Sequence, residues 1–261
     1  MTTPVEPGHR NDVIETVIVA RLSRNYGDSE SFQSRLQLLT LVETTASRLA
    51  DREQQGRFAL HRLRAMKVVL DGIPVVVDLG REQQAWLDAH HDAVSDNPIG
   101  DARAIESSYV LKVHAAFRDT SAADEIAWFM VQNDISGECE GLAGCYLDWQ
   151  DRLNGEYLRL HPRGHHAEEA VRDLARDLNA VADHNPSGCA VTGSSTALAT
   201  AVRRSASHHK AEALKAIERS HISAGEMISS GRFSPLRFRG GACRVDSRER
   251  PAGPPKGGHY R

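Results

Sequence analysis

Apolar residues recur every three or four positions along most of the chain, which is the spacing that puts side chains on one face of an α-helix. The clearest stretch lies between residues 167 and 182, where the apolar positions are Ala167, Ala170, Val171, Leu174, Leu178 and Val181. Similar spacing predicts helices over residues 13–22, 32–51, 58–70, 104–117, 121–130, 146–160, 196–204 and 210–228. The pattern therefore predicts an all-α protein.

Residues that favour helix starts and turns separate these segments. Asp28 or Ser29 is expected to cap the helix over 32–51, because short polar side chains accept hydrogen bonds from the first free amides of a helix. Ser121, with Asp124 three residues later, is expected to cap the helix over 121–130 in an arrangement close to a capping box. Residues 95–100 contain Asn, Pro and Gly and are predicted to form a loop.

One stretch, residues 74–94, allows two interpretations. Pro74 can occupy the first position of a helix that continues through Trp86 to Val94. The alternative for the three valines at 75–77 is a short buried strand, because runs of β-branched residues favour strands.

The segment His161-Pro162-Arg163-Gly164 separates the two strongest helical patterns. Pro162 lacks an amide hydrogen and disfavours helical geometry at His161, so the preceding helix should end near Leu160. Gly164 can adopt the positive φ that such a corner often needs. Together these residues predict a helix, a tight turn and a second helix.

Residues 156–171 resemble the corner of a tetratricopeptide repeat, in the style of bacterial envelope proteins. The resemblance rests on an aromatic-Leu pair, an aromatic-Pro position, a small residue, and an Ala-x-x-Ala that opens the next helix. His161 stands where that pattern prefers Tyr, and the Trp-Leu-Gly signature of typical repeats is missing. The resemblance implies antiparallel helix pairs that stack into an α-solenoid.

A weaker second copy lies at residues 117–127, which align with residues 161–171 without a gap. Ala123 matches Ala167, and Glu125 is identical to Glu169. The offset of 44 residues is longer than the 34 of a tetratricopeptide repeat. The alternative is that any two amphipathic helix starts show this degree of similarity.

Charge is distributed unevenly over the 261 residues. Residues 231–261 contain eight Lys/Arg and two acidic residues, which gives this segment a net charge of +6. Since the whole chain has a net charge of −3, the other 230 residues have a net charge of −9. An acidic body argues against nucleic-acid binding by the folded part, although the basic tail could contact RNA or another anionic surface. Aromatic residues make up only 5% of the chain, which favours helix over sheet.

These observations predict a succession of regions along the chain. They are a disordered N-terminus (1–12), an N-terminal helical region (13–95), tetratricopeptide-like helix pairs (96–184), a linker (185–195), C-terminal helices (196–230) and a disordered basic tail (231–261).

The sequence contains no apolar stretch of the ~18 residues that a membrane helix needs, and no secretory signal is recognised in its polar first ten residues. We therefore expect a cytoplasmic protein. Since envelope repeat proteins are usually exported, a periplasmic protein is the alternative if the true start codon lies upstream.

The sharpest candidate for chemistry is the pair Cys139 and Cys145, which lies among glycines. Both thiols could be inert, they could form a disulfide in an exported protein, or they could bind zinc together with His161 and His165. The spacing Cys-x5-Cys-x15-His-x3-His resembles a two-Cys, two-His zinc site, but its gaps are longer than those of the usual zinc finger.

No phosphate-binding loop and no nucleophile elbow occurs in the sequence. The function that the resemblance implies is a non-enzymatic scaffold or adaptor that binds a protein partner, with no cofactor and no catalytic residue. The alternative is a metal-binding protein or an enzyme that uses Cys139, Cys145, His161 and His165.

Overall fold

The computed structural model describes residues 7–24, 30–74, 78–97, 102–133, 143–184 and 195–218. Within these ranges the chain is almost entirely helical, so the predicted all-α class is confirmed. No helix in this part of the chain combines the length and the apolarity that crossing a membrane requires. The elements are α1 (Pro7–Leu22), α2 (Phe32–Ala46), α3 (Arg52–Leu70), α4 (Arg81–Ala89), β1 (Val94–Asn97), β2 (Ala102–Ile105), α5 (Ser107–Ala116), α6 (Ala123–Asn133), α7 (Ala143–Gln150), the π-helical η1 (Asp151–Gly155), α8 (Glu156–Leu160), α9 (Ala167–His184), α10 (Ser195–Arg204) and a helical segment at 210–218.

The N-terminal half packs α1, α2, α3, α5 and the β-hairpin around a first hydrophobic cluster. Asp51 begins α3 by accepting a hydrogen bond from the Gln54 amide at 2.8 Å, and the helix then buries one apolar face. Fully buried members of the cluster include Ile18, Leu38, Val42, Leu63 and Met66.

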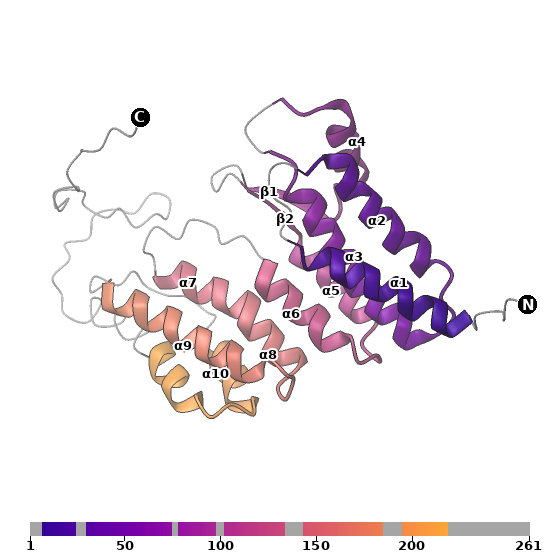
Figure 1. The fold of residues 1–261 in the computed structure, drawn as a ribbon. Coiled ribbons are helices and arrows are strands. Elements are labelled where there is room, and N and C mark those ends of the chain that lie inside the picture. Colours follow the sequence, from indigo (N-terminus) through magenta and orange to yellow (C-terminus); the bar gives the residue numbers. More distant parts are fainter. Residues whose placement is uncertain are drawn as a thin grey trace, which may run out of the picture.

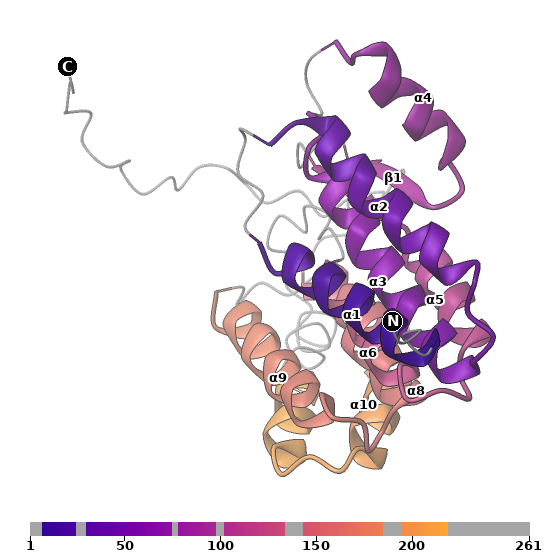
Figure 2. The same cartoon turned by 45° about the vertical axis from the view of Figure 1, so that its right-hand side comes forward.

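The C-terminal half packs α7, α8, α9, α10 and the segment 210–218 around a second hydrophobic cluster. It includes Leu147, Tyr157, Leu158, Ala170, Val171, Leu174 and Leu198, all of them fully buried. The two runs on either side of the predicted corner therefore bury their apolar residues in one common core. Figure 2 shows α4 and α10 at opposite ends of the molecule.

Helix α6 lies between the two clusters and is buried by both (Figure 1). Its Ile126, Phe129 and Met130 belong to the first cluster, whereas Ala127 and Trp128 belong to the second. Helix α6 therefore contributes one face to each of the two clusters.

The segment η1 interrupts the helical stretch that leads to the corner. A Cβ on Gly155 would lie 2.9 Å from Cδ1 of Leu198, so the glycine allows α10 to pack closely here. Gln150 donates a hydrogen bond to Asp177 of α9 at 2.9 Å and accepts one from Asn154 at 2.7 Å. The π-turn is thus fixed against two neighbouring helices.

Several predicted helix starts and one predicted N-cap are wrong. Helix α1 begins at Pro7, inside the segment predicted to be disordered, because proline suits the first helical position. Helix α4 begins at Arg81 and not at Pro74, after Gly80, whose amide donates to the Gln83 side chain at 3.0 Å. The N-cap of α2 is Ser31, and not the predicted Asp28 or Ser29.

The β-hairpin was not predicted. Strand β1 pairs antiparallel with β2, with Val94 opposite Ile105 and Asn97 opposite Ala102. The predicted loop at 95–100 and the region boundary at 95/96 therefore cross a strand, and α5 begins at Ser107 instead of Ala104. The two strands satisfy each other's backbone groups, which periodicity within either segment cannot reveal.

Several predictions concern residues outside the described ranges. They are the helix or strand at 75–77, the linker 185–195 except for Ser195, which begins α10, the last helix beyond residue 218, and the tail 231–261.

Candidate functional site

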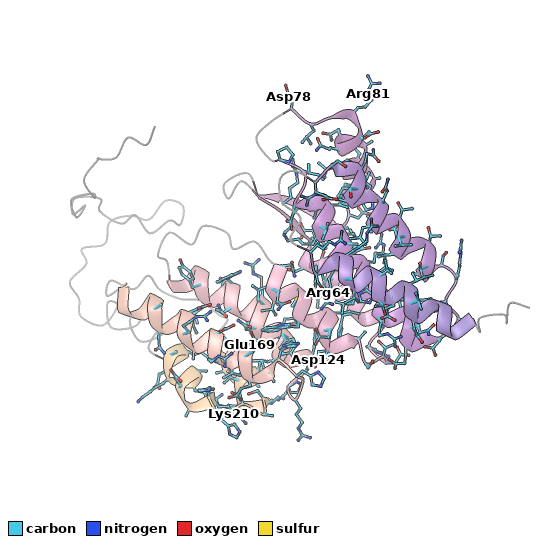
Figure 3. All side chains as sticks on the ribbon, viewed as in Figure 1. Arg64, Asp78, Arg81, Asp124, Glu169 and Lys210 are labelled. Atoms are coloured by element: carbon cyan, nitrogen blue, oxygen red, sulfur yellow. The ribbon has the colours of Figure 1, made fainter. Side chains whose placement is uncertain are left out.

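Asp124, the second residue of α6, is at the centre of a polar cluster at the corner between α8 and α9 (Figure 3). Its Oδ1 accepts a hydrogen bond from Tyr157 Oη at 2.6 Å, and its Oδ2 accepts one from the backbone N–H of His165 at 2.7 Å. One carboxylate therefore fastens α6 both to a side chain of α8 and to the backbone just before α9.

The capping box predicted from Ser121 and Asp124 does not form, because each residue finds its partner on another helix. Ser121 donates from its amide and its hydroxyl to Glu53 Oε2 of α3, at 2.9 Å and 2.8 Å. Packing of whole helices thus overrides the local interaction that the sequence favours.

Tyr157 is fully buried beside Asp124. Burial raises the pKa of its hydroxyl, and the hydrogen bond to Asp124 raises it further. The hydroxyl also accepts a hydrogen bond from the His166 amide at 3.0 Å. Tyr157 is therefore a neutral phenol that both donates and accepts at the corner.

His166 lies between two acidic side chains and an aromatic ring. Its Nε2 is 2.9 Å from Glu125 Oε1 of α6, and its Nδ1 is 3.5 Å from Glu169 Oε2 of α9. The ring stacks on Trp128, with 4.7 Å between centroids and 4° between planes. Arg64 of α3 reaches Glu125 at 3.6 Å, so this network connects α3, α6 and α9.

His161 ends α8 and contacts a histidine that the sequence did not indicate. Its Nε2 is 2.8 Å from Nε2 of His114 on α5. Burial lowers the pKa of both imidazoles. His114 is buried at the end of an ordinary amphipathic helix, and nothing in its local sequence distinguishes it from a core residue.

Gly164 is required at the corner, although not for the predicted reason. Its φ is outside the left-handed region, so the expected positive φ is wrong. A Cβ at this position would instead lie against Asp124 Oδ1 and Tyr157 Oη. The glycine therefore leaves room for the hydrogen bond between these two side chains.

The same backbone pattern occurs at the corner before α6. The Thr120 amide donates to Phe117 O at 3.0 Å, as the Gly164 amide does to His161 O at 3.0 Å. The Ala123 amide donates to Thr120 O at 3.2 Å, which corresponds to Ala167 and Gly164 at 3.2 Å. The two segments aligned in the sequence, 117–127 and 161–171, thus form corners with matching hydrogen bonds.

Each of three successive corners is closed by a carboxylate from a helix earlier in the chain, namely α3, α6 or α9. We call these three contacts the acid ladder. Each acid is the second residue of its helix. In the series α3, α6, α9 and the segment 210–218, each acid accepts a hydrogen bond from the backbone amide that lies two residues before the start of the next member. The contacts are Glu53 of α3 with Ser121 at 2.9 Å, Asp124 of α6 with His165 at 2.7 Å, and Glu168 of α9 with His208 at 3.0 Å.

The third corner shares with the second a histidine that contacts an acidic residue three positions later, but its other contact is with the ladder acid itself. His209 Nε2 is 3.4 Å from Glu168 Oε1, and its Nδ1 is 3.5 Å from Glu212. The corners touch, because the Ala206 amide donates to Pro162 O at 2.8 Å. The sequence holds a signal for this copy that our prediction missed: His-His-Lys-Ala-Glu-Ala at 208–213 matches His-His-Ala-Glu-Glu-Ala at 165–170.

The predicted metal and disulfide residues have different outcomes. Cys139 lies outside the described residues, and Cys145 is in α7 with a side chain that is not described, so the disulfide stays a prediction. His161 Nδ1 and His165 Nδ1 both approach Asp124, at 4.0 Å and 3.8 Å, and His165 is 88% exposed. Among the described side chains, no group of three or more His, Cys, Asp or Glu is arranged to hold a metal ion.

A cavity of about 270 Å³ lies far from the corners, between α4 and the β-hairpin. Its lining includes the apolar Leu79, Leu87 and Val94. The Arg103 guanidinium at its wall donates to the carbonyls of Ile73 and Pro74, at 3.2 Å and 2.6 Å. This cation is therefore already engaged by backbone acceptors.

Comparisons with protein-family models, curated proteins and solved structures found no match. The acid ladder and the corner network around Asp124 are the features from which a function can be argued.

Proposed function

We propose that this protein is a non-enzymatic helical-repeat adaptor that binds a protein partner. The observation that carries the proposal is the acid ladder, in which three successive corners use the same acid position and the same amide position. A contact that recurs once per unit is the expected signature of a repeat architecture, in which each unit contacts its neighbours.

The units would begin at α3, α6, α9 and the segment 210–218, with α5, α8 and α10 as the second helices. The corner amides at 121, 165 and 208 are 44 and 43 residues apart, which is a longer period than that of a tetratricopeptide repeat. We therefore propose a tetratricopeptide-like solenoid with lengthened units, and with α4 and the hairpin as an insertion in the first unit.

The chemistry of the corner supports a binding role over catalysis. The Asp124 and Glu168 carboxylates are taken up by backbone amides, and the Tyr157 hydroxyl is held by Asp124 and by the His166 amide. Groups that hold helices together are not free to exchange protons with a substrate.

The test is affinity capture with the full chain, followed by reconstitution of the complex from purified proteins. We expect one partner to bind with 1:1 or other fixed stoichiometry. Asp124→Asn, which weakens the ladder, should reduce the affinity for the partner, whereas Asp173→Asn, which changes a partly exposed carboxylate of α9 outside the ladder, should not. A complex equally stable with both variants would contradict binding through the stacked units.

The alternative function is tested on the same preparation. Stoichiometric zinc that is lost in a Cys139→Ser, Cys145→Ser variant would replace the adaptor proposal with a metal-binding protein. Metal below one-tenth of the protein concentration, together with a reconstituted complex, would support the adaptor.

A further inference from the structure

We propose that His114 and His161 form a proton-operated joint, in which protonation of both rings separates α5 from the corner between α8 and α9. This inference concerns regulation of the fold and does not depend on the adaptor function.

The geometry of the pair limits it to one shared proton between the facing nitrogens. The Nε2 atoms are 2.8 Å apart, and the rings meet edge to face with 88° between planes. A neutral imidazole can donate from Nε2 only to a partner whose Nε2 keeps its lone pair. When both rings are protonated, two N–H groups point at each other and two positive charges face across this distance, so the contact breaks.

The acidic groups near the pair compensate only in part for the repulsion between two protonated rings. Asp124 of α6 lies 4.0 Å from His161 Nδ1, and Glu156 of α8 favours the charged form of His114. Asp124 is already occupied by Tyr157 and by the His165 amide, and Glu156 is paired with Arg159 at 2.8 Å. Burial lowers the pKa of both histidines, so the pair is neutral at pH 7.

The location of the pair makes its opening consequential. Helix α5 belongs to the first hydrophobic cluster through Val110, whereas α8 belongs to the second through Tyr157 and Leu158. The contact between His114 and His161 therefore joins the two halves directly, without passing through α6. Loss of this contact leaves α6 and its neighbours to hold the halves together.

Two other histidines at the corners contact acidic side chains. His166 lies 2.9 Å from Glu125, and His209 lies 3.4 Å from Glu168. These side chains are partly exposed, and ion pairs of this kind contribute little. Repulsion within the half-buried pair therefore determines the direction of the response, which is loosening below neutral pH.

Amide hydrogen exchange of the full chain, followed by mass spectrometry at pH 7.5 and pH 5.5 and normalised for intrinsic rates, tests the joint. In the wild type we expect protection of peptides 107–117 and 156–166 to be lower at pH 5.5 than at pH 7.5, because the pair loses its contact when both rings are protonated. His114→Gln keeps a donor towards His161 but removes one titrating ring, so protection of these two peptides should change less between the two pH values than it does in the wild type. His91→Gln, an exposed control, should respond like the wild type.

A pH response in His114→Gln as large as that of the wild type would overturn the proposal, as would protection in the wild type that does not change with pH. If His114→Gln fails to fold, His161→Gln at the chain corner provides the same test. The histidine ring protons of the wild type, followed by NMR, give an independent measure. Titration of the pair in two separated steps supports the joint, and two independent titrations overturn it.

Discussion

At the scale of single residues, Asp124 concentrates the interactions that close the second corner. It provides acceptors for the Tyr157 hydroxyl and for the His165 amide, which come from two different elements. We expect Asp124→Ala to destabilise the fold by about 1–3 kcal/mol, because it leaves the Tyr157 hydroxyl as a buried donor without this acceptor. Urea denaturation followed by circular dichroism measures this difference.

Asp173→Ala is the matched control for Asp124→Ala. Asp173 lies on α9 and pairs with an arginine that is 67% exposed, Arg176, at 2.9 Å. Such pairs contribute about 0.2–1 kcal/mol. Equal losses in the two variants would show that Asp124 is an ordinary surface acid.

His61, which is not part of any corner, makes the free energy of unfolding depend on pH. It is buried on α3, where its Nε2 contacts Glu15 of α1 at 3.1 Å. Burial lowers its pKa, although the hydrogen bond to Glu15 acts in the opposite direction. The folded state therefore holds His61 neutral while the unfolded chain binds a proton near pH 6.5. Its contribution is fully present above that pH and is lost as the pH falls.

We expect the free energy of unfolding to decrease between pH 7.5 and pH 5.5, and His61→Gln to reduce the size of this decrease. Guanidinium denaturation at both pH values measures it, with His91→Gln as the exposed control. A decrease of the same size in His61→Gln and in the wild type would assign the pH dependence to other groups.

At the scale of elements, the helices were predictable, and so was the end of α8 at Leu160, but several helix starts were not. The apolar spacing of α9 and of the run from α7 to α8 is visible in the sequence because each helix buries its own face. Ser121 and Asp124 show why a predicted start failed: their partners are 68 and 41 residues away, on other helices. The local sequence could indicate that these residues form hydrogen bonds, but it could not indicate which element holds their partners.

Part of the candidate site was predictable from the sequence and part was not. The corner at His161 to Gly164 and the start of α9 follow from Pro162 and from the apolar pattern. The contact of His161 with His114 depends on how α5 packs, and nothing within either segment indicates it. The β-hairpin at 94–105 was missed for the same reason, since each strand has only four residues.

Packing of α8 against α9 gives a prediction at this scale. Ala170 is fully buried in the second cluster together with Tyr157 and Leu158. Ala170→Phe should cost about 1–3 kcal/mol, because a larger side chain in a packed core displaces its neighbours. Chemical denaturation measures the effect, with Ala180→Phe on an exposed position of α9 as the control. A neutral Ala170→Phe would mean that the helices do not pack through this face.

At the scale of the whole molecule, α6 makes the two clusters depend on each other. We expect them to unfold together, because loss of either cluster exposes one face of α6. Trp86 belongs to the first cluster and Trp128 to the second, so two variants, each with one of these as its single tryptophan and with Trp149 also replaced, report on each half. Their denaturation midpoints should coincide, and two separated transitions would show that the halves fold independently.

The acid ladder also has a direction, and this bears on how the chain is made. At every corner the acceptor precedes its donor in the sequence: Glu53 comes before Ser121, Asp124 before His165, and Glu168 before His208. A ribosome releases the N-terminal part first, and domains form as they emerge. The carboxylate that closes each corner has therefore already left the ribosome when the corner's amide appears, so synthesis and assembly proceed in the same order.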